Sequence, residues 1–176
     1  MRVLTTALLT AALALTPAHA QTRTSTPPKT EQPAVWLGLG TEAIIIPELQ
    51  LAASVPVYRS GDLNVSMRGN VDATFGLYAL GADVLLNQGN RGWYGGPSAA
   101  VIVGGARTGW AAGGLAGYRT VLGEHLGFFV EGRVRYLYVP EVFVSQQPLR
   151  PGQPVPPRTD LSSVLPGLHL GLTYRF

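Results

Sequence analysis

Apolar and polar side chains alternate every second residue through most of the chain after residue 34. The last nine residues show the pattern best, because Leu168, Leu170, Leu172, Tyr174 and Phe176 alternate with small or polar residues. A two-residue period is that of a β-strand with one apolar face. Similar segments recur upstream, separated by short runs of the residues that favour turns. The pattern predicts eight strands, over 35–45, 49–58, 63–74, 78–86, 93–103, a segment that holds Trp110 and Tyr118, 126–138, and about 164 to 176.

Most of the predicted connections between these strands are short. Pro47 and Glu48 are expected to turn the chain between the first two strands. Residues 140–163, rich in Pro, Gln and Arg, are expected to form a long excursion between the last two. Pro97 interrupts the fifth strand, which predicts weak pairing or a bulge there. An even number of strands with tight alternate connections is typical of an up-and-down order.

The charged residues inside the predicted strands fall on the face opposite the apolar series. In the strand over 126–138, Glu131, Arg133 and Arg135 share a face with Phe129. The same alternation places Tyr58 on the polar face of the second strand. Arg175 is set aside because it lies at the predicted rim, which leaves four acids and four bases. Isolated buried charges are costly, so we expect a paired network inside the fold. Its members are Glu42, Arg68, Asp72, Asp83, Arg119, Glu131, Arg133 and Arg135.

The composition of the two faces predicts which one points outward. A soluble sandwich or a lipocalin-like barrel would be apolar inside and polar outside. Here the polar face carries much Gly, Ala and Ser and few Lys or Glu, which suits a narrow interior better than a solvated surface. An open sheet in lipid would leave its edge amides unpaired, so the sheet must close. The sequence therefore predicts an all-β fold, a closed antiparallel eight-stranded up-and-down transmembrane β-barrel whose lumen is filled by side chains.

Aromatic residues on the apolar face are expected to mark the two membrane interfaces. Trp110 and Tyr118 share a face eight residues apart, a separation of roughly 26 Å along a strand. That distance is close to the height of the apolar band between the aromatic girdles of such barrels. Tyr136 and Tyr138 lie on the same face of the seventh predicted strand. These four residues are the predicted aromatic girdle.

The first 20 residues have the features of a secretory signal peptide. Arg2 precedes an apolar run to Leu15, and Ala18-His19-Ala20 forms a small-x-small cleavage site. A cleaved signal peptide over 1–20 is favoured over an uncleaved anchor helix because the apolar run is too short. Residues 21–33 are polar and contain prolines, so a flexible periplasmic tail is expected before a barrel over 34–176.

Composition and charge exclude several other classes. The length of 176 residues suits one domain. Outside the N-terminus the chain has no run of about 20 apolar residues, which excludes helical membrane spans in the mature chain. The chain has no cysteine, which excludes disulfides, thiolate metal sites and a cysteine nucleophile. The net charge of +3 is scattered and forms no basic patch with interleaved aromatics, so no nucleic-acid partner is expected.

The signal peptide, the alternating strands and the ending Leu-Gly-Leu-Thr-Tyr-Arg-Phe together resemble the small eight-stranded outer-membrane proteins of bacteria. This family includes the OmpA transmembrane domain, OmpX, and OmpW-like or opacity-type porin-like barrels. The resemblance implies that the barrel-assembly machinery recognises Leu170, Leu172, Tyr174 and Phe176. It also implies an outer-membrane location, contact with outer-membrane lipid, periplasmic termini and an extracellular 140–163 connection. Three very short surface connections depart from the family pattern and leave the subfamily open.

Candidate catalytic chemistry is sparse in this sequence. The mature chain has two histidines, His125 in a predicted turn and His169 facing inward on the closing strand. His169 could meet Glu131 or Ser163 in an acyl-transfer arrangement. No motif of the lipid-modifying barrels is matched, so a histidine hydrogen-bonded in the lumen is the favoured interpretation. Ligand spacing for a metal is absent, and no cofactor is expected.

Two classes of function remain open. The first is a non-enzymatic structural or interaction protein of the outer membrane, which contacts an unidentified extracellular partner through the 140–163 connection. The second is a narrow channel for small solutes. A lipid-modifying enzyme is the weakest alternative. The balance of inward charges favours a plugged lumen, and therefore the first class.

Overall fold

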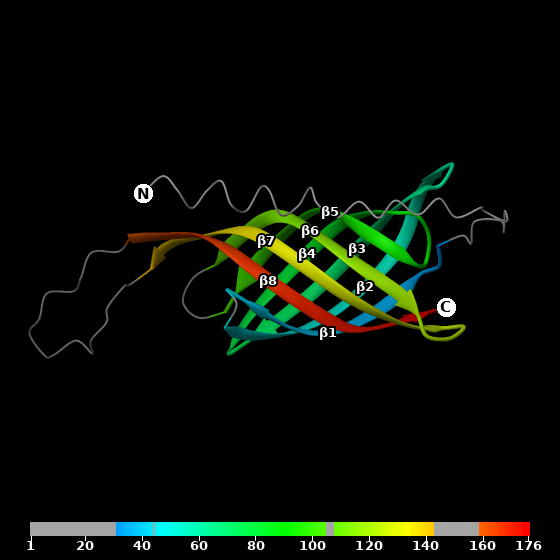
Figure 1. Ribbon diagram of the computed structural model, residues 1–176. Helices are drawn as coiled ribbons and strands as arrows, with labels where there is room; N and C mark the ends of the chain where they lie inside the picture. The colour runs from blue at the N-terminus through cyan, green and yellow to red at the C-terminus, as the bar shows by residue number, and fades with distance from the viewer. Residues whose placement is uncertain (1–30, 44, 105–107, 143–158) are drawn as a thin grey trace, which may run out of the picture.

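The computed structural model describes residues 31–43, 45–104, 108–142 and 159–176. These residues form a closed barrel in which each strand pairs antiparallel with the next and β1 pairs with β8 (Figure 1). The predicted all-β, closed, eight-stranded up-and-down fold is confirmed. Among the described residues no helix is long and apolar enough to cross a membrane. The strands are β1 (Ala34–Glu42), β2 (Ile46–Ser60), β3 (Leu63–Thr74), β4 (Leu77–Asn87), β5 (Gly92–Val103), β6 (Gly109–Val121), β7 (Leu126–Val142) and β8 (Thr159–Arg175).

The two ends of the barrel differ. At one end Ala34 pairs with Arg175, so the first and last strands meet there beside the C-terminus. We name this the terminal end. At the opposite end β7 and β8 extend beyond the other strands (Figure 1), and we name it the loop end.

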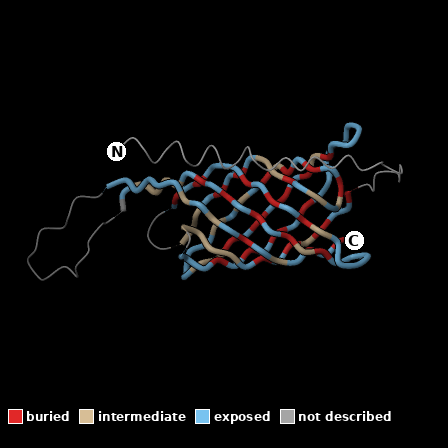
Figure 2. Tube along the Cα trace, in the orientation of Figure 1, coloured by how far each residue is buried: buried red, intermediate tan, exposed pale blue. Residues whose placement is uncertain are grey.

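Burial follows the two-residue period of the sequence. In β7, Glu131, Arg133 and Arg135 are buried, whereas the intervening Val134 has an exposed fraction of 55%. Figure 2 shows the same alternation of buried and exposed positions along the strands. The buried side chains point into the lumen and the apolar series forms the outer surface, as the strand pattern predicts.

The first turn lies earlier than the sequence predicted. Ala43, with a φ of 51°, follows β1 directly, and β2 begins at Ile46. Pro47 and Glu48 are therefore strand residues that pair with Thr41 and Gly40. A proline is tolerated close to the start of a strand, because few ladder hydrogen bonds are required of it there. The consequence is that the Glu48 side chain, expected in a turn, is buried in the lumen.

The long excursion predicted over 140–163 is shorter than expected. β7 continues to Val142 and β8 begins at Thr159, with a register shift after Val139. The Asp160 carboxylate accepts hydrogen bonds from the Tyr138 hydroxyl at 2.8 Å and from the Glu141 amide at 3.1 Å. These contacts extend the strand pair past the irregularity. The part of the predicted connection over 143–158 lies outside the described residues.

A bulge in β2 reverses the predicted orientation of Tyr58. Pro56 pairs with Ser66 and Tyr58 pairs with Val65, so Val57 is skipped in the register. An extra residue in one strand shifts every later side chain to the opposite face. Tyr58 therefore lies on the outer surface with an exposed fraction of 63%, and its predicted place on the polar face was wrong.

Candidate functional site

The candidate site is the lumen, where three strands contribute a buried arginine with two carboxylates. The Arg68 Nε atom donates to Asp83 at 2.8 Å, and its Nη1 and Nη2 atoms donate to Glu131 at 2.8 and 3.0 Å. Arg68 and Asp83 are direct cross-strand partners in β3 and β4, whereas Glu131 reaches across the lumen from β7. All three side chains have an exposed fraction of 0%. The guanidinium is therefore fully paired, as a buried charge requires.

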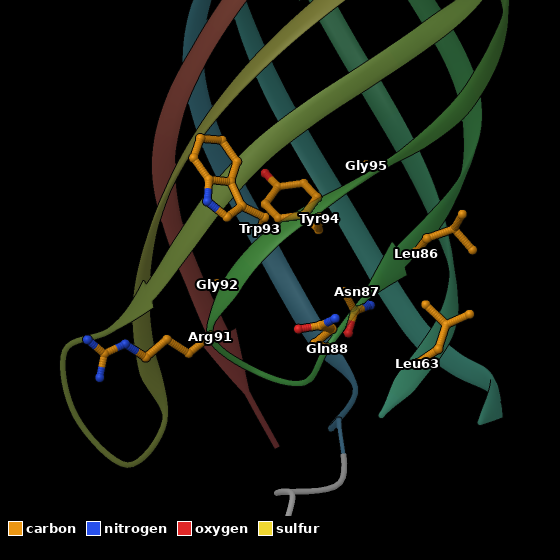
Figure 3. Close-up of a pocket in the computed structure, with 9 residues that line it drawn as sticks. All are labelled: Leu63, Leu86, Asn87, Gln88, Arg91, Gly92, Trp93, Tyr94 and Gly95. Atoms are coloured by element: carbon orange, nitrogen blue, oxygen red, sulfur yellow. The ribbon is translucent and has the colours of Figure 1, made fainter. Parts of the chain in front are cut away.

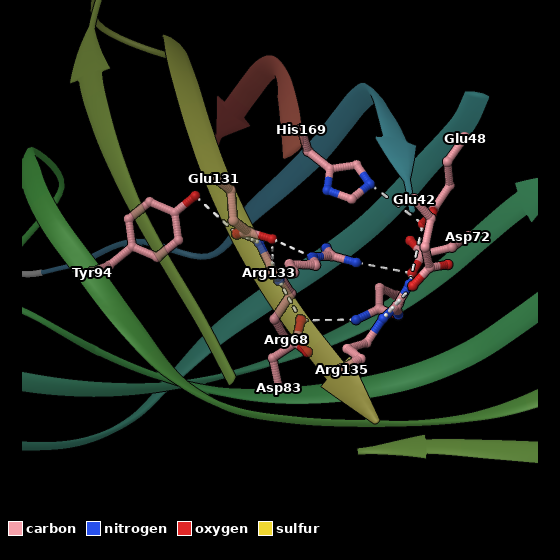
Figure 4. Close-up of polar contacts among 11 residues, drawn as sticks. Glu42, Glu48, Arg68, Asp72, Asp83, Tyr94, Glu131, Arg133, Arg135 and His169 are labelled. Carbon is pink, nitrogen blue, oxygen red and sulfur yellow. Dashed lines mark hydrogen bonds and ion pairs between the residues drawn. The ribbon is translucent and has the colours of Figure 1, made fainter. Parts of the chain in front are cut away.

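Every second residue of β7 from Glu131 onward makes further ion pairs, in order toward the loop end. Arg133 donates to Glu131 at 2.6 Å and to Asp72 at 3.0 Å. Arg135 donates to the same Asp72 oxygen at 3.2 Å and to Glu42 at 2.7 Å. The result is one continuous chain of ion pairs, which we name the ionic cluster (Figure 4). Its members, in order, are Asp83, Arg68, Glu131, Arg133, Asp72, Arg135 and Glu42.

The terminal side of the lumen holds aromatic rings instead. Trp36 packs edge-on against Tyr94 and Phe129, with ring centroids 5.5 and 5.1 Å apart. We name these three residues the aromatic layer. The Trp36 indole donates to Ser54 at 2.9 Å, and the Arg68 guanidinium lies 5.0 Å from the centroid of the Trp36 ring. The aromatic layer is thus attached to the ionic cluster.

Glycines on neighbouring strands make room for these rings. A Cβ atom added at Gly117 would lie 2.6 Å from the Tyr94 hydroxyl oxygen, and one at Gly171 would lie 2.8 Å from a Phe129 ring carbon. Contacts this short do not occur in folded proteins, so only glycine fits beside the rings. The sequence pattern placed Phe129 on the polar face of its strand but did not identify the three rings as a group. The sequence feature that could have predicted this group is the presence of large aromatic residues on the same face as glycines.

Arg119, the remaining predicted member of the charge network, lies apart from the ionic cluster. Its Nη2 atom donates to Glu31 at 2.7 Å at the terminal end, and Glu31 also accepts from Asn87 at 2.9 Å and from the Ser66 hydroxyl. Glu31 is 3% exposed. The burial of Glu31 was not predicted, because the polar, proline-containing composition of residues 21–33 indicated a flexible tail.

The described end of that expected tail is held by the barrel. The Gln32 amide donates to Asn90 at 3.2 Å, and the Phe176 amide donates to the Pro33 carbonyl at 3.1 Å. Residues 31–33, which the sequence pattern assigned to the tail, therefore contact the barrel in the structure. Residues 21–30 and the expected signal peptide over 1–20 lie outside the described residues.

Glu48 and His169 form a second contact that the sequence did not predict. His169 Nε2 lies 3.4 Å from Glu48 Oε1, and Arg135 Nη2 lies 3.7 Å from the same oxygen. Neither carboxylate oxygen of Glu48 accepts a hydrogen bond from a described residue. In the backbone register of β7 and β8, His169 lies opposite Glu131, and Ser163 lies opposite Leu137 further along the same strands. The contact of His169 is therefore with Glu48, and it includes no serine.

The described residues place more charges inside the barrel than the sequence predicted. Glu31 and Glu48 join the four predicted acids, and Arg175, set aside at the rim, is also buried, so six carboxylates accompany five arginines. Neither additional acid was a predicted member, because both come from segments that the sequence pattern assigned to a tail and a turn. No group of three or more His, Asp or Glu residues within the described ranges is arranged to hold a metal ion.

The predicted girdle residues lie on the outer surface and divide between the two ends of the barrel. Trp110 lies 5.8 Å from Tyr136 and 5.9 Å from Tyr138, between ring centroids, towards the loop end. Tyr118 packs against Trp93 at 5.4 Å towards the terminal end. The sequence analysis did not include Trp93 in the girdle.

The predicted assembly residues follow the outer surface of β8 toward the same end. Tyr174 stacks on His125 and packs edge-on against Phe176, with ring centroids 5.7 and 5.3 Å apart. The exposed fractions are 51% for Leu170, 45% for Leu172, 49% for Tyr174 and 66% for Phe176.

Comparisons of the chain with family models, with curated proteins and with solved structures found no match. The barrel itself is shown by the structure, whereas the similarity to small outer-membrane proteins rests on the sequence pattern.

Proposed function

We propose that this chain is a small outer-membrane barrel whose filled lumen makes it a structural or surface-interaction protein. The outer surface is the observation that carries this proposal. Leu37, Leu51, Leu170 and Val134 lie on it with exposed fractions of 52%, 54%, 51% and 55%. Soluble proteins rarely expose apolar patches of more than a few hundred Å². Lipid is the solvent in which such a surface is stable.

The filling of the lumen supports an interaction role over transport. The aromatic layer crosses the terminal half, and the ionic cluster occupies the loop half. The 17-residue strands β7 and β8 extend beyond the other strands at the loop end, and the chain connects them through residues 143–158. We assign partner contact to this connection, with outer-membrane lipid and the barrel-assembly machinery as the other partners. The protein acts without catalysis in this proposal.

Heat-modifiable migration in detergent gels, together with cell fractionation, tests the membrane location. We expect the folded protein to migrate differently from the boiled protein and to fractionate with outer membranes. Leu37→Arg should destabilise the barrel by about 2–4 kcal/mol, because the arginine would lie against hydrocarbon. Glu124→Arg is the matched control, since it changes an exposed turn residue. A signal-free protein that stays monodisperse in buffer without detergent would contradict the proposal.

Recording in planar bilayers tests the filled lumen separately. We expect no stable conductance from the inserted protein. A stable conductance would favour a narrow channel for small solutes.

A further inference from the structure

A groove lies on the barrel wall at the terminal end, where β4 ends and β5 begins (Figure 3). Its volume is about 540 Å³. Two kinds of residues line it. Leu63, Leu86 and Trp93 belong to the outer apolar series, and Gln88 and Arg91 belong to the turn between the strands. The remaining lining residues are Asn87, Gly92, Tyr94 and Gly95.

The groove forms because the first two residues of β5 do not pair with β4. Asn87 and Tyr94 are the last paired residues of the two strands. Gly92 and Trp93 pair instead with Arg119 and Tyr118 of β6. Gly89 and Gly92 have φ values of 112° and 113°, which favour glycine and allow the chain to turn away. The turn thus leaves a gap beside Leu63, the first residue of β3.

The lining is amphipathic, with apolar side chains from the strands and polar side chains from the turn. Leu63, Leu86 and Trp93 have exposed fractions of 43%, 45% and 73%, and Trp93 is held in place by its packing against Tyr118. Gln88 and Arg91 lie on the side of the turn, beyond the strand ends (Figure 3). No acidic residue lines the groove, and Arg91 has no ion-pair partner among the described residues.

We propose that this groove binds one phospholipid with a net negative headgroup. The phosphate would accept hydrogen bonds from the Gln88 amide and from the Arg91 guanidinium, which points away from Gln88 in Figure 3 and would turn toward it on binding. An acyl chain would lie against Leu63, Leu86 and Trp93. An arginine at the level of an aromatic girdle attracts anionic lipid without a large desolvation cost. This inference rests on the proposed membrane location.

Quenching of Trp93 fluorescence by brominated lipid tests the inference. The Trp110→Phe variant leaves Trp93 and Trp36, and Trp36 is buried at 0% exposure and shielded from lipid. The protein is inserted into phosphatidylcholine vesicles that contain a small equal fraction of either brominated phosphatidylglycerol or brominated phosphatidylcholine. We expect stronger quenching by brominated phosphatidylglycerol.

Two further substitutions in this background separate the groove from the general charge of the rim. Arg91→Gln should lower the preference for phosphatidylglycerol about fivefold. One cation near an anionic lipid surface contributes about 1 kcal/mol, which corresponds to that factor. Arg59→Gln removes the same charge from the terminal end at a residue that does not line the groove, and it should keep the preference. Equal quenching by the two lipids, or equal effects of the two substitutions, would overturn the inference.

Insertion is measured on the same samples by vesicle flotation and heat-modifiable migration. Failure to insert contradicts the proposed membrane location. Full insertion without a lipid preference contradicts the groove alone.

Discussion

The two halves of the lumen hold their buried side chains by different physical means. The ionic cluster depends on partners, because each buried charge is costly once its counter-charge is removed. The aromatic layer depends on volume, because its rings pack against one another and into spaces left by glycines. The halves meet where Tyr94 donates to Glu131 at 2.9 Å and Arg68 lies over Trp36. The comparison indicates that substitutions in the two halves should differ in cost.

The largest effect is expected from Arg68→Ala. It leaves the carboxylates of Asp83 and Glu131 buried with one partner fewer, which should lower the free energy of unfolding by about 3–5 kcal/mol. Urea unfolding in detergent micelles measures the change. Arg91→Ala is the control for loss of an exposed arginine and should change stability by less than about 0.5 kcal/mol. Equal values for the two variants would mean that the ionic cluster contributes little.

A somewhat smaller effect is expected from Trp36→Leu in the aromatic layer. The substitution leaves a cavity and removes the hydrogen bond to Ser54, so we expect a loss of about 2–4 kcal/mol. Trp110→Leu, on the outer surface, is the matched control for loss of an indole. If Trp36→Leu costs more than Arg68→Ala, packing rather than charge pairing dominates the lumen.

Glu31→Gln tests the contact at the terminal end. The amide cannot replace the charge-assisted bond to Arg119, so a loss of about 1–2 kcal/mol is expected. Proteolysis of residues 31–33 should become faster as the segment detaches. The exposed Glu124→Gln serves as control, and unchanged proteolysis would show that Glu31 does not hold the segment.

The smallest effect is expected from Glu48→Gln. Glu48 faces the carboxylates of Glu42 and Asp72 (Figure 4), and its oxygens accept no hydrogen bond from a described residue. Loss of this charge should therefore leave stability within about 0.5 kcal/mol of the original protein. A loss as large as that of Arg68→Ala would identify Glu48 as an essential partner of His169 and Arg135.

The strand order and the inward charges could be predicted because the pleat alternates every two residues. In β7, the alternation of Glu131, Arg133 and Arg135 with apolar residues allowed only one assignment of the inward and outward faces. The alternation gave wrong orientations or bounds at two places. The bulge before Tyr58 moves that side chain to the other face, and the early turn makes Glu48 a strand residue. Glu31 could not be predicted, because its burial depends on Ser66, Asn87 and Arg119, which are distant in the chain. The groove beside Arg91 also depends on strand separation that no local pattern encodes.

The seam between β1 and β8 joins residues 34–42 to 167–175, the two extremes of the described barrel. A ribosome that stops before codon 159 would release a ribbon with two open edges, and each edge is a template for pairing with another chain. Partial products of this gene should therefore aggregate rather than insert. If the proposed outer-membrane location holds, export of the whole chain before the barrel closes would avoid that outcome.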